Sequence, residues 1–162
     1  MHKREQAIKY IKNPGSMCVA CCVVAIEEGS PVDLSALHLK LLNLEQNEYR
    51  GACNPGLTSI RSYFRGRGGQ ADFLPGALPA DICRLRTEGK HVVVETKGCP
   101  GHAIVVKQVM ADEVVVMDPD WNQPERRVPI AEFLQLRNNR AGCVMNCCWI
   151  QLPCSSGSSI KH

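Results

Sequence analysis

A histidine and an aspartate stand at the two ends of a β-rich stretch that reads GHAIVVKQVMADEVVVMDPDW over residues 101–121. Its branched residues form two short runs around a polar break at residues 111–113, which predicts a β-hairpin. His102 starts the first strand and Asp118 follows the second, so antiparallel pairing brings them within about two residues of each other across the ladder. An imidazole beside a carboxylate supplies two parts of a catalytic triad, and only a nucleophile is missing.

The candidate nucleophile is Cys18, which stands where a turn at residues 13–16 passes into an apolar run. A cysteine attacks as its thiolate, and both a helix N-terminus and a neighbouring imidazolium stabilise that form. We therefore predict Cys18 as nucleophile, His102 as base and proton shuttle, and Asp118 as the group that fixes the imidazole tautomer. The simpler interpretation is a buried thiol and a strand-capping histidine. The order and setting of the three residues favour the triad.

The composition is that of one globular domain, with 162 residues of which 44% are hydrophobic and 22% charged. We expect a single domain over residues 1–154 and a disordered tail over residues 155–162. A net charge of +3 is too small to indicate nucleic-acid binding, and no apolar run is long enough to cross a bilayer. The glycine-rich residues 66–69 lack the lysine of a phosphate loop, and no cofactor is predicted.

The first twelve residues are charged throughout and lack the apolar centre of a secretory signal. This pattern predicts synthesis in the cytosol, with any export depending on a specialised route.

Ten cysteines are many for a chain of this length. Without a secretory signal, a disulfide scaffold is not expected, and buried thiols, a zinc site or a redox-sensitive centre remain. Cys18 and Cys21 have metal-ligand spacing and, alternatively, that of a disulfide in an oxidised, inactive form. Cys147 and Cys148 are adjacent in a predicted strand and so face opposite ways. We therefore predict no metal, and keep structural zinc as an alternative.

The elements that must position the triad are helices first and strands afterwards. A buried helix is expected over residues 18–26, capped by Ser16, and an amphipathic helix follows from the N-cap Asp33 to about Asn47. Thr58, or alternatively Asn54, is the expected cap of a third helix. Shorter helices are predicted from residue 79 and from residue 129, and a short helix or arm over residues 4–12.

The predicted strands cover residues 70–74, 91–95, the two runs of the hairpin and residues 143–152. Residues 122–128 are expected to form a loop. The sequence therefore predicts one α+β domain in which N-terminal helices pack on an antiparallel sheet. His38 and His91 are expected to be surface or packing residues, and Trp121 a half-buried packing residue or one wall of a cleft. Asp120 is an alternative to Asp118 as orienting group.

These motifs resemble the papain-like cysteine hydrolases, and within them the C39-type peptidases of bacteria, over roughly residues 13–136. In that family a cysteine opens the central helix, and a strand-borne Gly-His is followed by Asp-Pro at a spacing like that of His102 and Asp118. The run Met17-Cys18-Val19-Ala20-Cys21 is also similar to the start of papain-fold toxin domains and glutamine-deamidase effectors, whose first cysteine is the nucleophile. The resemblance implies a papain-like fold with the cysteine at a buried helix start.

Two departures from the family pattern affect the expected site. The family's oxyanion-hole glutamine corresponds to Lys12, and Gln6 lies too far upstream to replace it. Asn13 has a suitable amide and is our candidate for the oxyanion hole, together with the backbone N–H of Cys18. The usual glycine after the nucleophile is Val19, which crowds the approach to the thiol. A weak peptidase, a deamidase and an inactive relative all fit these departures.

The sequence thus predicts a thiol amidohydrolase acting on a protein or peptide, either as a cysteine protease or as a glutamine deamidase. The resemblance implies a bacterial effector or toxin, whose partners would be a host target protein or a cognate inhibitor. A non-catalytic binding or adaptor module on the same fold is the main alternative, and a zinc-stabilised interaction domain is the third.

Overall fold

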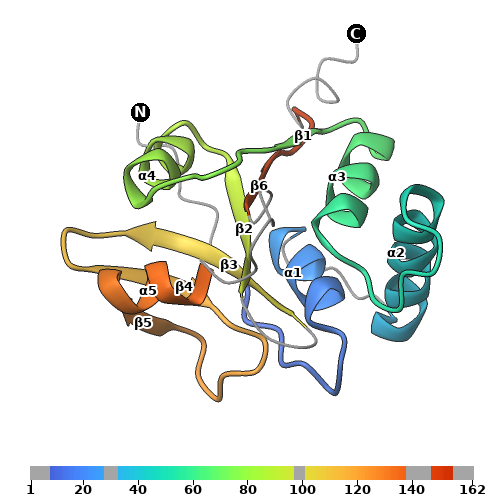
Figure 1. The fold of residues 1–162 in the computed structure, drawn as a ribbon, viewed down its shortest axis with the longest axis horizontal. Coiled ribbons are helices and arrows are strands. Elements are labelled where there is room, and N and C mark those ends of the chain that lie inside the picture. The colour runs from blue at the N-terminus through green and yellow to red at the C-terminus, as the bar shows by residue number, and fades with distance from the viewer. Residues whose placement is uncertain (1–7, 28–32, 97–100, 138–146, 155–162) are drawn as a thin grey trace, which may run out of the picture.

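The computed structural model describes residues 8–27, 33–96, 101–137 and 147–154. Within these ranges the helices and strands alternate irregularly along the chain (Figure 1). None of the helices there is both long and apolar enough to span a bilayer. The helices are α1 (Cys18–Ile26), α2 (Leu34–Glu48), α3 (Leu57–Gly66), α4 (Pro79–Thr87) and α5 (Ile130–Arg137), and the strands are β1 (Gln70–Phe73), β2 (His91–Thr96), β3 (His102–Val109), β4 (Glu113–Met117), β5 (Arg126–Pro129) and β6 (Cys147–Gln151).

The strands form one sheet in the order β1-β6-β2-β3-β4-β5, and every neighbouring pair is antiparallel. The predicted α+β class with an antiparallel sheet is therefore confirmed. The expectation of a loop over residues 122–128 is wrong at its end, because β5 begins at Arg126. This edge strand contains two arginines and a proline, and only Val128 is buried, so it lacks the run of branched residues that identifies a strand.

The sheet separates two hydrophobic cores. Residues of α1, α2 and α3 pack on one face, and residues of α4 and α5 pack on the other (Figure 1). Successive side chains of a strand point to opposite faces, and β2 shows this with Val93 in the first core and Val92 in the second. Cys148 and Cys147 divide in the same way, as predicted.

Helix α1 is the centre of the first core. All of its residues after Cys18 are buried, and their small size lets the helix lie close to β3, where the Cys22 thiol donates to the Ala103 carbonyl at 3.5 Å. The predicted Ser16 cap is wrong. Ser16 adopts a left-handed conformation with φ of 54°, and the acceptor for the Met17 N–H is instead Oδ1 of Asn13, at 3.0 Å.

The two following helices differ in how well their starts were predicted. Asp33 caps α2 as expected, accepting from the backbone N–H groups of Ser35 and Ala36. The Thr58 cap of α3 is wrong. The buried Glu45 carboxylate of α2 accepts from the N–H groups of Gly56 and Ser59, at 2.6 and 3.2 Å. An acidic group at a helix N-terminus satisfies free N–H groups and opposes the helix dipole.

The remaining boundaries agree with the sequence predictions to within a few residues where the structure describes them. Residues 8–17 contain no helix or strand, so the described part of the predicted arm is not helical. The start of the predicted last strand, residues 143–146, and the predicted tail, residues 155–162, lie outside the described residues.

Candidate active site

The hairpin brings His102 and Asp118 together. Val105 of β3 pairs with Met117 of β4, so Asp118 follows in register opposite Ile104, two residues from His102. The Nε2 atom of His102 lies 2.6 Å from Oδ1 of Asp118, a short distance typical of a charge-assisted hydrogen bond. The ladder thus places the two side chains where the hairpin pattern predicts them.

Asp118 is buried and has several donors. Its residue exposure is only 3%, and its two oxygens receive His102 Nε2, the backbone N–H of Asp120 at 2.9 Å and Arg126 Nη1 at 2.9 Å. Burial by itself would raise the pKa of this carboxyl, but these contacts outweigh it and lower the pKa to about 2. Asp118 is therefore an anion over the whole working range of an enzyme.

The pKa of the His102 imidazole is shifted in the opposite direction to that of Asp118. Burial opposes its charged form, but the hydrogen bonds with Asp118 and with the Cys18 thiol prevail and raise the pKa of His102 to about 10. Its side chain keeps 22% of its surface exposed, so the ring is held yet reachable from solvent. This environment favours an imidazolium at neutral pH.

Cys18 is the first residue of α1, is half-buried, and its thiol is a hydrogen-bond partner of the His102 ring. The first N–H groups of a helix have no partner within it and favour nearby negative charge. Cys21 and Cys22 are buried one turn further on. Burial, and secondarily the charge of Cys18, raises the pKa of Cys21 to about 12 and holds the pKa of Cys22 well above its usual value. Of these three thiols, only Cys18 is placed to act as a nucleophile.

Arg126 is the site residue that the sequence analysis missed. Besides its ion pair with Asp118, its Nη2 lies 3.6 Å from Glu132 Oε1, and its guanidinium carbon lies 4.6 Å from the ring centre of Trp121. Trp121, expected to be half-buried, is 40% exposed and lies over this guanidinium. The two adjacent arginines of the edge strand could have indicated this residue, because successive side chains of a strand point to opposite faces and one of the two must therefore point inward.

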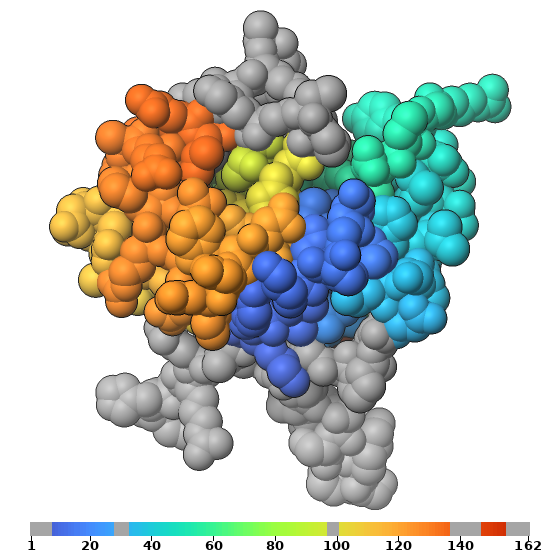
Figure 2. Space-filling view, turned by 90° about the horizontal axis from the view of Figure 1, so that it is seen from below, coloured from blue at the N-terminus to red at the C-terminus, as the bar shows by residue number. Residues whose placement is uncertain are grey.

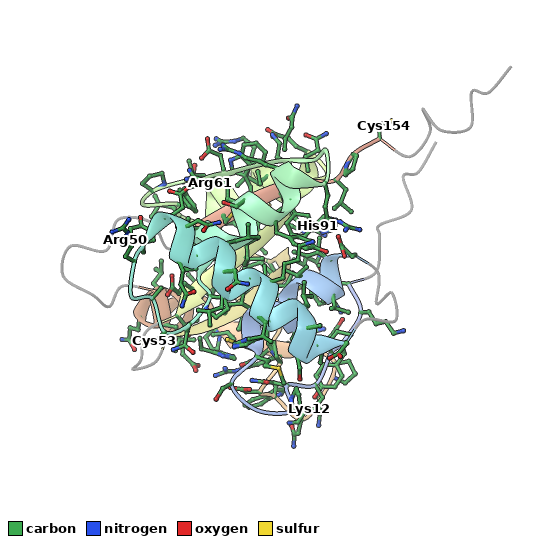
Figure 3. All side chains as sticks on the ribbon, turned by 90° about the vertical axis from the view of Figure 1, so that its right-hand side faces the viewer. Lys12, Arg50, Cys53, Arg61, His91 and Cys154 are labelled. Carbon is green, nitrogen blue, oxygen red and sulfur yellow. The ribbon has the colours of Figure 1, made fainter. Side chains whose placement is uncertain are left out.

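The segment before α1 is tied to the turn after β4. The Asn13 N–H donates to the Pro119 carbonyl at 2.8 Å, and the Tyr10 hydroxyl donates to the Trp121 carbonyl. Figure 2 looks at this end of the molecule, where the blue N-terminal segment lies directly against the orange segment after β4. Lys12 projects at the same end, with Nζ 3.5 Å from the Trp121 carbonyl (Figure 3). The segment before Cys18 and the turn that follows Asp118 are thus linked directly.

The side-chain amide of Asn13 is fixed by contacts on both sides. Its Oδ1 accepts from the N–H groups of Gly15 at 2.9 Å and Met17 at 3.0 Å, which settles which end is the oxygen. Its Nδ2 donates to Oδ1 of Asp120 at 2.8 Å. An amide nitrogen carries two protons, so one remains for a developing oxyanion. The oxyanion role of Asn13 stays a prediction.

Three further predictions concern Val19, a zinc site and His91. Val19 is buried in the first core, so its side chain packs inward with the helices rather than standing at the surface. No three His, Cys, Asp or Glu side chains among the described residues converge as metal ligands, which leaves the zinc alternative without a ligand set there. His91 is buried, in agreement with a packing role.

Comparison with solved structures gives three similar folds. A putative C39-like peptidase from Bacillus anthracis matches at TM-score 0.67 and 13% identity, over 90% of this chain and 95% of that one. A double glycine motif protease from an AMS/PCAT transporter, solved with its leader peptide, matches at 0.62 and 15%, over 93% and 96%. The peptidase domain of Streptococcus ComA, a bi-functional ABC transporter, matches at 0.60 and 13%, over 90% and 99%. No family model and no curated protein matches the chain.

At these low identities the comparisons establish the fold. The chain has the papain-like fold of C39-type peptidases across nearly all of its length, as the sequence motifs predicted. A shared fold does not by itself assign chemistry, which must come from the site residues.

Proposed function

We propose that this chain is a papain-like cysteine peptidase with Cys18 as nucleophile, His102 as acid and base, and Asp118 as the orienting carboxylate. One observation carries the proposal: the His102 ring is held between a buried carboxylate at 2.6 Å and a thiol at the first residue of a buried helix. The fold shared with C39-type peptidases supports the same assignment.

In the proposed reaction His102 holds the proton of the Cys18 thiol, and the sulfur attacks the carbonyl carbon of an amide. The tetrahedral oxyanion is stabilised by the Cys18 N–H and by the free N–H of Asn13 Nδ2. His102 then protonates the departing amine, which leaves a thioester on Cys18. Water attacks the thioester with His102 as base, and the released acid and free thiol complete the cycle. Asp118 keeps the ring oriented throughout.

The proposed substrate is a protein or peptide. A similar structure is that of a protease in complex with a leader peptide, which supports an extended peptide as the kind of ligand this fold accepts. The same residues would also hydrolyse a glutamine side chain, with ammonia as the leaving group. The leaving group therefore separates peptidase from deamidase, and the triad does not.

The test is incubation of the purified chain with a mixed peptide library, read by mass spectrometry. We expect new peptide termini with wild type, none with Cys18→Ala, and unchanged cleavage with Cys53→Ala, which removes an exposed thiol in the loop before α3. Glutamine-to-glutamate conversion without new termini would replace the peptidase assignment by the deamidase one. Identical output from wild type and Cys18→Ala would favour the binding module.

We further propose, from the resemblance to papain-fold toxins and effectors, that the chain acts on a protein of another cell. Expression inside bacterial and eukaryotic host cells tests this, with growth and the host proteome as readouts. Growth arrest or target cleavage that disappears in Cys18→Ala would support it. Equal growth and equal proteomes for the two proteins would contradict it.

A further inference from the structure

Asp120 contacts both halves of the proposed site. Its Oδ1 accepts from Asn13 Nδ2 at 2.8 Å, and its Oδ2 lies 3.4 Å from His102 Nδ1. Asp118 occupies the other ring nitrogen, so two carboxylates flank one imidazole. The two differ in exposure, because the side chain of Asp120 is 58% exposed and that of Asp118 only 4%.

We propose that Asp120 is a positioning residue that aligns the oxyanion donor Asn13 with the imidazole of His102. The inference rests on the function proposed above and goes beyond its triad. In this role Asp120 touches no reacting atom and acts through the two side chains that it joins.

Asp120 anchors the nitrogen end of the Asn13 amide. The amide oxygen of Asn13 is held by two backbone N–H groups, and a partner for Nδ2 anchors the other end of the same planar group. Asp120 is that partner and accepts one of the two N–H groups. The geometry of a planar amide then fixes the second N–H, which makes it a preorganised donor. Without the carboxylate only the two hydrogen bonds to Oδ1 would hold the amide plane.

Asp120 also lies beside the His102 ring. Because Nε2 is held by Asp118, Nδ1 is the atom left for the Cys18 thiol, and Asp120 lies beside it. Carboxylates at both nitrogens favour the imidazolium and oppose rotation of the ring between turnovers. Among the described residues, the charged or titratable groups in contact with the ring are Cys18 from α1, Asp118 directly after β4 and Asp120 from the following turn. Arg126 of β5 lies behind Asp118, and Glu95 of β2 lies beside Gly101, the residue before His102.

The chain offers a conservative variant and a matched control. Asp120→Asn keeps an acceptor oxygen for Asn13 but removes the charge beside His102, whereas Asp120→Ala removes both. Asp112→Asn makes the same chemical change at an exposed residue of the β3–β4 turn, the far end of the hairpin from His102.

The probe is p-nitrophenyl acetate, an activated ester that acylates a reactive thiol and needs no knowledge of the natural peptide. Each rate is corrected by subtracting the Cys18→Ala rate at the same pH, and the melting temperature of each variant is measured. We expect Asp120→Ala to lower kcat about tenfold with little change in KM, since preorganisation and not binding is lost. We expect Asp120→Asn to stay within about threefold of wild type and to shift the basic limb of the pH profile downward.

Two results would overturn the proposal. One is an Asp120→Ala protein that matches Asp112→Asn in rate and pH profile, and the other is an Asp120→Asn protein no faster than Asp120→Ala. A wild-type protein without any hydrolysis dependent on Cys18 would overturn the proposed function itself, and the role of Asp120 with it. The first two results leave that function intact, so the failures are distinguishable.

Discussion

His91 and His102 make an instructive pair, because each begins a strand of the same sheet and each is largely enclosed by protein. The strands β2 and β3 are antiparallel, and Thr96, at the end of β2, pairs with His102. The two histidines therefore lie at opposite ends of one two-stranded ribbon. Each histidine is the first residue of its strand, but the pKa of His91 is lowered and that of His102 is raised.

The charged groups beside each ring account for the difference. His91 is 4% exposed and its Nδ1 lies 3.5 Å from Arg86 Nη1, so burial and the nearby cation lower its pKa to about 4. Burial acts on His102 in the same direction, but Asp118 reverses the result and raises the pKa to about 10. A histidine at a strand start is thus a neutral packing residue or a proton carrier according to its partner.

Replacing each histidine by glutamine should give the largest difference between the two positions. His102→Gln should lower the peptidase or esterase rate by about 10²- to 10⁴-fold, because the site loses its acid and base. His91→Gln should retain most of the rate, since the ribbon separates it from Cys18, and should lower the melting temperature. Initial rates and thermal melts on both variants check this. Equal loss of rate in the two folded variants would contradict the distinction.

The two neighbouring arginines of β5 should differ in their effect on the reaction rate. Arg126→Gln removes the ion pair on Asp118 Oδ2, while Arg127→Gln removes an exposed pair with Glu113. We expect about a tenfold loss of rate for Arg126→Gln and an acidic limb moved to higher pH, since the buried carboxylate loses a cation. Arg127→Gln should cost less than about 1 kcal/mol of stability and leave the rate unchanged. A pH–rate profile separates the two, and coincident profiles would show that Arg126 does not support Asp118.

The smallest expected effect is on how the stability of the fold depends on pH. Unfolded histidine titrates near pH 6.5, to be compared with about 4 for folded His91 and about 10 for folded His102. The contribution of His91 to the stability of the folded state is therefore present above pH 6.5 and is lost as the pH falls toward 4. The contribution of His102 to the stability of the folded state is present below pH 6.5 and is lost as the pH rises through 10.

Melting temperatures across pH should show these opposite trends as differences of a few degrees. The gap between wild type and His91→Gln should narrow toward pH 4, and the gap between wild type and His102→Gln should narrow toward pH 10. Two gaps that vary with pH in the same direction would contradict the assigned charge states.

The parts of the site that a local pattern could predict are those carried by one strand pair or one helix. The branched runs around residues 111–113 were sufficient to predict the hairpin, and its register places Asp118 two residues from His102. The apolar, small residues after Cys18 likewise predicted a buried helix. In both cases the side-chain period follows from backbone geometry alone.

The parts that escaped prediction depend on partners distant in sequence. Arg126 reaches Asp118 only because β5 lies beside β4, and Asn13 reaches Asp120 only because the N-terminal segment crosses the turn after β4. Glu45 caps α3 from the last turn of α2, which no local capping pattern encodes. The Ser16 cap is different, because its replacement is local: Ser16 adopts a left-handed conformation, and the nearby Asn13 side chain accepts from the Met17 N–H.

The central claim is tested most directly by iodoacetamide alkylation across pH, read at each thiol by peptide mass spectrometry in wild type and His102→Gln. The account predicts that Cys18 alkylates much faster than the exposed Cys53 near neutral pH, and that this excess disappears in His102→Gln. Cys21 and Cys22, which are buried, should stay unmodified while the protein is folded. A Cys18 that reacts no faster than Cys53 in the reduced wild-type protein would contradict the thiolate–imidazolium pair and favour the binding module.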